Sequence, residues 1–128
     1  MDSLPQGQLD EIITLGAEVL RLKRDKDVTD TQAALEEAIR RVRAFAEIQR
    51  ACYRDLECTL DGVVLGQRVV PVSCAAVYAP GGRYPLPSSV LMGVVPARVA
   101  GVDEVIVLSP KLHPVTLAAA ILAGADRI

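Results

Sequence analysis

Two segments near the amino end of the chain carry apolar residues at helical spacing. From Leu9 to Lys23 these residues recur every three or four positions, which predicts an amphipathic helix. The polar run KRDKD, residues 23–27, is expected to break this helix. A second helix is predicted from Thr31 to Arg50, again with one apolar face. That face consists of Leu35, Ala38, Ile39, Val42, Phe45 and Ala46.

The polar residues of the second helix have spacings that favour a cap and ion pairs. Thr29 and Gln32 have the spacing of a capping box at its start. Two pairs of opposite charge, four positions apart, are expected on its outer face. They are Glu36 with Arg40 and Glu37 with Arg41. Neither helix can bury its apolar stripe alone, so both need the rest of the chain or a partner.

The periodicity changes after residue 56. The sequence LDGV, residues 60–63, is a turn signal between two short strand-like runs. Residues 68–72 are also predicted to be extended. A strand is predicted over residues 75–78, and a loop leads to a helix from Ser88 to Ala100. The next run, Glu104–Leu108, is almost wholly apolar, as in a strand that is covered on both faces.

The carboxyl-terminal part completes an alternation of strands and helices. A helix is predicted from Val115 to Ala123, and Arg127–Ile128 resembles the first step of a third strand. This order is typical of a parallel sheet with right-handed crossovers. The predicted fold is therefore α/β, with a helical segment (residues 1–52) before a partial Rossmann-like domain (residues 53–128). Its sheet is an incomplete βαβαβ half, unless residues 56–72 or another chain supply the missing edge.

Composition and charge narrow the class of protein. The residues are 51% hydrophobic and 23% charged, with a net charge of −2, which is ordinary for a soluble protein and argues against nucleic acid as a partner. The amino end lacks a signal-peptide pattern, and no apolar run reaches membrane-spanning length, so we expect a cytoplasmic protein. Cys52, Cys58 and Cys74 lack metal-ligand spacing and are expected to be buried, reduced thiols. Tyr53 is expected in the core, and His113, the only histidine, in a loop.

The sequence VYAPGGRYPLPSS, residues 77–89, is the candidate binding loop. It follows a predicted parallel strand, and open α/β sheets bind ligands at the carboxyl ends of their strands. Gly81 and Gly82 allow unusual backbone conformations and close approach of a ligand. Ser88 or Ser89 can cap the next helix, whose free amides favour an anion. From these residues alone a rigid structural turn is an equally good explanation, because APGG is not the G-x-G-x-x-G of dinucleotide loops.

A longer segment resembles a known family. LGQRVVPVSCAAVYAPGGRYPLPSSVLMGVVPARVAGVDEVIVLSP, residues 65–110, is similar to histidinol dehydrogenases, in which LGQRV, YVPGG, YPSSVLM and IPAKVAGV occur in this order. The likeness continues through LAAAILAGADRI, residues 117–128, and extends back to AIRRVRAFAEIQ, residues 38–49. The resemblance implies a homodimeric, zinc-containing enzyme of histidine biosynthesis. That enzyme oxidises L-histidinol to L-histidine in two NAD-dependent steps.

Little of the family's active site carries over to this chain. The cofactor-contacting tyrosine, the first residue of YVPGG, matches Tyr78. The cofactor-binding residues expected from the motif and the loop are Tyr78, Gly81, Gly82 and Ser88. The family's substrate serine, its glutamate–histidine acid/base pair and its zinc ligands all lie beyond the position that matches Ile128, and His113 matches none of them. No catalytic or metal-binding residue is therefore assigned.

Two hypotheses follow from this incomplete match. In the first, the chain is part of a histidinol dehydrogenase, carries part of its NAD-binding half and is inactive without the missing carboxyl-terminal portion. In the second, the chain is a non-catalytic, self-associating module derived from that fold. The first hypothesis requires the rest of the enzyme as a partner, and the second requires a homo-oligomer.

Overall fold

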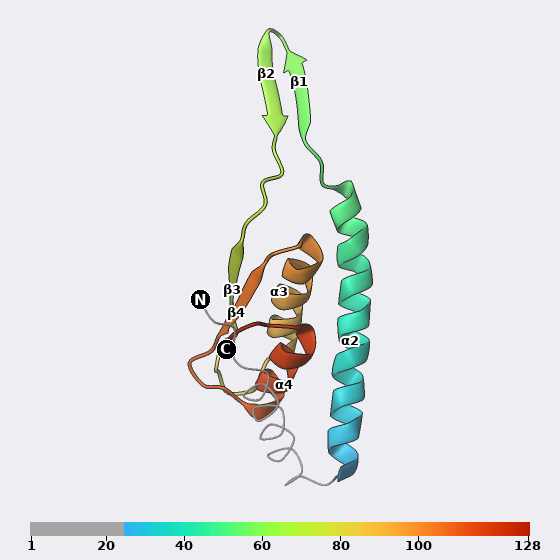
Figure 1. The fold of residues 1–128 in the computed structure, drawn as a ribbon, viewed down its shortest axis with the longest axis vertical. Helices are drawn as coiled ribbons and strands as arrows, with labels where there is room; N and C mark the ends of the chain where they lie inside the picture. The colour runs from blue at the N-terminus through green and yellow to red at the C-terminus, as the bar shows by residue number, and fades with distance from the viewer. Residues whose placement is uncertain (1–24) are drawn as a thin grey trace.

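The structure is a computed structural model that describes residues 25–128, with side chains described from Thr31 onward (Figure 1). The helix predicted from Leu9 to Lys23 lies outside the described residues. The elements, in chain order, are α2 (Asp25–Cys52), β1 (Leu56–Leu60), β2 (Val63–Gln67), β3 (Cys74–Tyr78), α3 (Pro87–Ala100), β4 (Glu104–Leu108) and α4 (Pro114–Ala123). Within this part of the chain no helix combines the length and the apolar character that crossing a bilayer requires.

Strands β3 and β4 form a parallel pair, and α3 connects them. The register runs from Cys74 opposite Glu104 to Tyr78 opposite Leu108. A single parallel bridge between Ile106 and Arg127 begins a third strand beside β4. The predicted alternation of strands and helices is thus confirmed, as is the α/β class with a partial Rossmann-like sheet. The segment from β1 to β2 forms a separate sheet and does not extend the parallel one.

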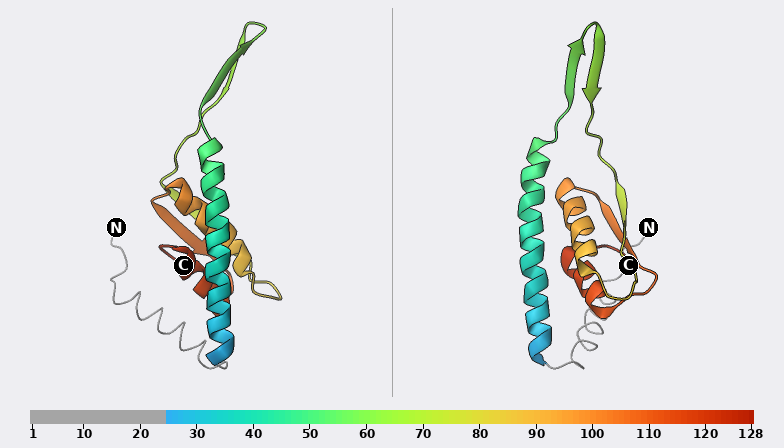
Figure 2. Two further views of the ribbon diagram at one scale, coloured as in Figure 1. Left: turned by 90° about the vertical axis from the view of Figure 1, so that its right-hand side faces the viewer. Right: turned by 180° about the vertical axis from the view of Figure 1, so that it is seen from behind.

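The core lies between one face of the parallel sheet and the helices α2, α3 and α4 (Figures 1 and 2). Val105 and Val107 of β4 point into it and are fully buried, as are the α3 residues that pack on them. The residues of β3 and β4 that alternate with the core-facing ones lie on the opposite face of the sheet. There Tyr78 is 64% exposed and Leu108 51% exposed. The prediction that Glu104–Leu108 is covered on both faces is therefore wrong, because the described helices lie on one side only.

Helix α2 is longer than predicted at its amino end. It begins at Asp25, so residues 25–27 are already helical, six residues before the predicted start at Thr31. The predicted break of the Leu9–Lys23 helix lies outside the described residues. Thr29 lies inside the helix, and its predicted role as a capping residue is wrong. At the other end, the helix continues to Cys52, two residues beyond the predicted end.

The buried stripe of α2 is narrower than the sequence indicates. Leu35 and Ile39 are buried in the core with residues of α3 and α4, and Ala46 is also buried, but Phe45 is 62% exposed. One residue corresponds to about 100° of rotation around a helix, so Phe45 points away from a contact that Ala46 makes. The prediction that Phe45 lies on the buried face is wrong.

The charges on the outer face of α2 pair around Glu37. Its carboxylate accepts hydrogen bonds from Arg40 and Arg41, both at 2.7 Å, and these bonds lower the pKa of Glu37 to about 2. The predicted pairing of Glu37 with Arg41 is confirmed. Arg40 pairs with Glu37 instead of Glu36, and the side chain of Gln32 donates to Glu36 at 2.8 Å.

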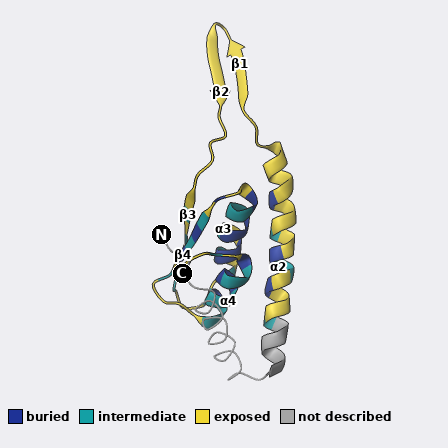
Figure 3. Cartoon of the chain, in the orientation of Figure 1, coloured by how far each residue is buried: buried dark blue, intermediate teal, exposed yellow. Residues whose placement is uncertain are grey.

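Strands β1 and β2 form a hairpin that extends away from the rest of the molecule (Figures 1 and 2). Asp61 and Gly62 form its turn with φ angles of 49° and 80°, as the sequence predicts. Every residue of the hairpin is exposed (Figure 3).

Exposure around the hairpin corrects two predictions about burial. Cys52, Cys58 and Cys74 are free thiols as expected, but all three are exposed. Tyr53 is 64% exposed and does not belong to the core. The physical reason is the same for the three cysteines and for Tyr53: the segment between the end of α2 and the start of β3 does not pack on the core.

Candidate cofactor site

Tyr78 is the last residue of β3 and lies at the carboxyl end of the parallel sheet. Its ring projects from the uncovered face, beside Leu108 of β4, its partner in the register. The next residue, Ala79, turns back into the core: it is 1% exposed, and its N–H donates to the carbonyl of Leu108 at 2.8 Å. The end of the strand is thus anchored while the phenol ring remains accessible.

Gly81 is required for a close contact between the two loops that follow the parallel strands. A Cβ atom at this position would lie 2.8 Å from the Cβ and 2.9 Å from the backbone nitrogen of Lys111. The proposed need for an unusual backbone conformation is wrong, because neither Gly81 nor Gly82 has a positive φ. Gly82 has no atom within 4 Å of an added Cβ, so space beside it is open. Gly81 therefore allows the two loops to approach each other closely, whereas the position of Gly82 is open.

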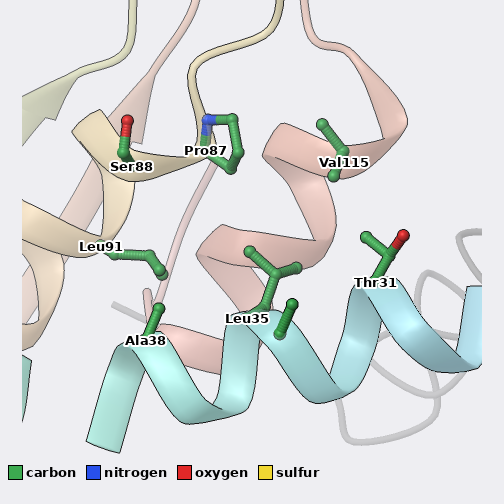
Figure 4. A pocket seen from close by; sticks show the side chains of 8 residues that line it. Thr31, Leu35, Ala38, Pro87, Ser88, Leu91 and Val115 are labelled. Carbon is green, nitrogen blue, oxygen red and sulfur yellow. The ribbon is translucent and has the colours of Figure 1, made fainter. Parts of the chain in front are cut away.

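Neither serine at the start of α3 caps the helix, which corrects the prediction. The N-cap residue is Leu86, whose side chain cannot accept a hydrogen bond, and Pro87 occupies the first turn. Ser88 is exposed and lies at the edge of an open groove between the helices, with its hydroxyl group directed away from α2 (Figure 4). The groove is lined by Thr31, Ala34, Leu35, Ala38, Pro87, Ser88, Leu91 and Val115. Tyr78, Gly81 and Gly82 do not line this groove, so the structure does not bring Ser88 together with them.

Two cations lie in the loops at the carboxyl end of the sheet. Lys111 follows β4 and contacts Gly81, and the guanidinium of Arg83 lies 5.8 Å from the centre of the Tyr84 ring. The sequence analysis did not predict that Lys111 lies beside Gly81. A signal for it exists, since loops that follow adjacent parallel strands meet at the same edge of a sheet.

His113 lies in the loop between β4 and α4, where it caps the helix. Its Nδ1 accepts a hydrogen bond from the backbone N–H of Val115 at 3.3 Å. His113 therefore acts as the N-cap of α4, a role that Ser or Asp more often has.

A partly exposed ion pair lies at the opposite end of β4. Arg98 of α3 pairs with Asp126, whose Oδ2 also accepts the N–H of Val105 at 2.6 Å. Desolvation raises the pKa of Asp126, but the hydrogen bonds from Arg98 and Val105 outweigh it, so this pKa is below its usual range. The pair stabilises the start of β4 and is separate from the candidate site.

The described residues include neither an activated cysteine nucleophile nor a cluster of metal ligands. Desolvation by its neighbours raises the pKa of the Cys74 thiol, and the carboxylate of Glu104 raises it further, so the thiol stays protonated at neutral pH. Within residues 25–128 no three side chains of His, Cys, Asp or Glu gather as a metal site would require. A zinc ion therefore does not fit this part of the chain.

Comparison with known proteins identifies the family. A sequence profile of histidinol dehydrogenase matches residues 6–128. Histidinol dehydrogenase from Aquifex aeolicus is 46% identical over 101 residues, covering 77% of this chain and 23% of that protein. The enzyme from Pseudomonas aeruginosa is 41% identical over 132 residues, and that from Haloarcula marismortui is 44% identical over 130; each alignment covers 99% of this chain and 29% of the relative. The chain thus spans less than a third of the length of these relatives. It belongs to the histidinol dehydrogenase family.

Proposed function

We propose that this chain carries part of the NAD-binding half of a histidinol dehydrogenase. In this proposal it contributes to the oxidation of L-histidinol to L-histidine only together with the remaining portion of the enzyme. The observation that carries the proposal is the exposed ring of Tyr78 at the carboxyl end of β3. Family membership supports it, because Tyr78 matches the tyrosine with which histidinol dehydrogenases contact the cofactor.

The surroundings of Tyr78 fit one end of a dinucleotide. The phenol ring offers a flat surface, and stacking of a base on an aromatic side chain contributes about 1–3 kcal/mol. The open space beside Gly82 leaves room for the cofactor backbone, and Lys111 supplies a positive charge for its phosphates. NAD, when bound, supplies the hydride acceptor. Tyr78, Gly82 and Lys111 would bind and orient it.

The proposed inactivity of this chain on its own follows from the chemistry of the reaction. Oxidation of an alcohol needs a base to remove the hydroxyl proton as hydride leaves the carbon. The family's acid/base pair and zinc ligands match positions beyond Ile128. The uncovered face of the sheet, which carries Tyr78 and Leu108, is where the remaining portion would pack.

Mixing this chain with the separately prepared carboxyl-terminal portion of a related histidinol dehydrogenase should restore NADH formation from L-histidinol. Neither part alone should produce NADH, since one lacks the acid/base pair and the other lacks Tyr78. The absorbance of NADH measures the reaction, and gel filtration verifies that the two parts associate. Verified association without any NADH formation would contradict the proposal.

Replacement of Tyr78 by alanine should weaken NAD binding about tenfold, corresponding to ~1.4 kcal/mol, because the stacking surface is lost. Titration calorimetry of the full chain with NAD measures the effect. Tyr84→Ala is the matched control, since Tyr84 is a similarly exposed tyrosine, 68% against 64%, in the following loop. Equal heats for the chain with and without Tyr78 would leave this residue without a role in binding.

A second candidate function is a non-catalytic module that associates with copies of itself. The exposed apolar hairpin favours it, because such a surface needs a partner in water. This candidate does not require NAD binding, so the calorimetric experiment does not test it. A monomer at high concentration in sedimentation would exclude its self-association.

A further inference from the structure

The open groove beside Ser88 is apolar and lies between the amino-terminal halves of α2, α3 and α4 (Figure 4). Its volume is about 600 Å³, which several side chains would fill. Of the eight residues that line it none is charged, and six are apolar: Ala34, Leu35, Ala38, Pro87, Leu91 and Val115. Leu35 and Leu91 are buried, whereas Ala34 is exposed. Such a surface is more stable when another apolar surface covers it.

The segment from Leu9 to Lys23 has an apolar face that suits this groove. The residues of that face are Leu9, Ile12, Ile13, Gly16, Val19 and Leu20. At about 100° per residue, Glu11, Thr14 and Glu18 lie on the opposite side of the same helix. Gly16, at the middle of the apolar face, has no side chain and allows another helix to approach closely. A helix of about 15 residues is marginal in water by itself, so this one needs a surface to pack on.

The position of this segment in the chain puts the groove within its reach. The predicted helix ends at Lys23, and α2 begins at Asp25. Helices joined by a short connection pack as antiparallel neighbours, as in an αα-hairpin. The groove follows the first turns of α2, from Thr31 to Ala38, so a helix that turns back at residue 24 runs alongside it.

We propose that the segment Leu9–Lys23 forms an amphipathic helix that packs antiparallel to α2 and covers this groove. Counted equally in both directions from residue 24, Ile13 comes level with Leu35, in the middle of the groove. Leu9 comes level with the end of the groove at Ala38. The apolar face of the segment and the apolar walls of the groove would leave water together.

A single uninterrupted helix through residue 24 would leave both apolar surfaces uncovered. At 1.5 Å per residue, Gly16 would then lie about 22 Å beyond Thr31 along the axis of α2, out of reach of the groove. The stripe around Gly16 would also be rotated by about 100° from the stripe around Leu35. The antiparallel arrangement covers both surfaces at once and is therefore favoured.

This inference does not depend on the proposed function. The groove is separate from the candidate cofactor site, because Tyr78, Gly81 and Gly82 do not line it. Failure of the calorimetric or the complementation experiment therefore leaves the inference intact. Its own failure leaves the proposed role in NAD binding intact.

Disulfide formation within the full chain tests which face of the segment lies on the groove. Cys52, Cys58 and Cys74 are exposed, so serine can replace all three, and Ala34→Cys then places one thiol at the groove. A second cysteine at position 12, 13 or 16 should form an intramolecular disulfide on mild oxidation. A cysteine at position 11, 14 or 18, on the opposite face, should give at least a tenfold lower yield, because the two Cβ atoms must come within about 4.5 Å.

Mass spectrometry measures these yields and distinguishes between occupants of the groove. Equal yields on the two faces, or no disulfide at any position, would overturn the proposal. A disulfide-linked dimer in place of the intramolecular bond would show that the segment of a second copy occupies the groove, and would likewise overturn it. Circular dichroism checks that each variant is folded.

Two neighbouring alanines of α2 provide a second, matched test. Ala33 and Ala34 are both exposed, but only Ala34 lines the groove. Ala34→Lys should lower the melting temperature by roughly 5 °C or more and reduce the helical ellipticity, because it displaces the segment. Ala33→Lys should change neither quantity appreciably. Equal melting temperatures for the two variants would contradict the proposal.

The same change in the segment tests whether the two surfaces share one contact. Ile13→Lys should lower the melting temperature about as much as Ala34→Lys, whereas Thr14→Lys, on the opposite face, should not. Ile13→Lys and Ala34→Lys together should lower it hardly further than either alone, because each already releases the segment. Fully additive effects would show that residues 13 and 34 belong to different contacts, and the proposal would then be wrong.

Discussion

Replacement of Gly93 by valine is expected to lower the free energy of unfolding by about 3 kcal/mol, at the upper end of overpacking effects. Gly93 lies on the side of α3 that faces β3. A Cβ atom there would lie 2.5 Å and 2.9 Å from the two γ-carbons of Val77. The β-branched side chain of Val77 has little freedom to move aside, so the helix and the strand must separate. Since Tyr78 follows Val77, the candidate cofactor site would shift with the strand.

Urea denaturation followed by circular dichroism measures this effect. Gly93→Ala should be less harmful, because alanine favours a helix by about 1 kcal/mol over glycine and thereby offsets part of the clash. Gly82→Ala is the control and should change stability by less than about 0.5 kcal/mol, since open space surrounds Gly82. Combining Gly93→Ala with Val77→Ala should recover part of the loss, because the clashing carbons are removed. A Gly93→Val chain as stable as the wild type would show that α3 and β3 are not in close contact.

Arg98→Ala is expected to cost about 2–3 kcal/mol of stability, because one side chain bonds to several segments. Arg98 donates to the carbonyl of Gly124 at 2.7 Å and to that of Val102 at 3.2 Å, and it pairs with Asp126. These bonds connect the end of α3, the approach to β4 and the end of α4. Arg98→Lys should recover only part of the loss, since an ammonium group cannot reproduce the planar fork of a guanidinium.

The response to acid distinguishes loss of this pair from loss of packing alone. The pKa of Asp126 is lowered in the folded chain. The pair therefore stabilises the fold above the unfolded pKa of about 3.9, and this contribution is lost as pH falls through the lower folded pKa. Urea denaturation from neutral pH to about pH 3 should show a smaller loss of stability in Arg98→Ala than in the wild type. Glu37 has its own arginine partners and should contribute equally to both chains. Identical acid dependence would exclude a role for the Arg98–Asp126 pair.

The candidate site could be predicted from the sequence only in part. The alternation of strands and helices placed Tyr78 at the carboxyl end of a parallel strand, and the structure leaves its ring accessible there. The role of Gly81 could not be predicted, because it depends on contact with Lys111 from the loop after a different strand. Ser88 fails as a cap because Leu86 and Pro87 occupy the start of α3, and it lies at the edge of the groove between α3 and α2 instead.

By itself the sequence determined the local structure. Apolar spacing and the Asp61–Gly62 turn signal depend on backbone conformation over a few residues. Most predicted elements agree with the structure within one or two positions. Only the tertiary structure decided which surfaces are covered. An apolar residue has the same local signal whether a distant segment lies over it or not, so the exposure of Phe45, of the hairpin and of one face of the sheet depended on where those segments lie.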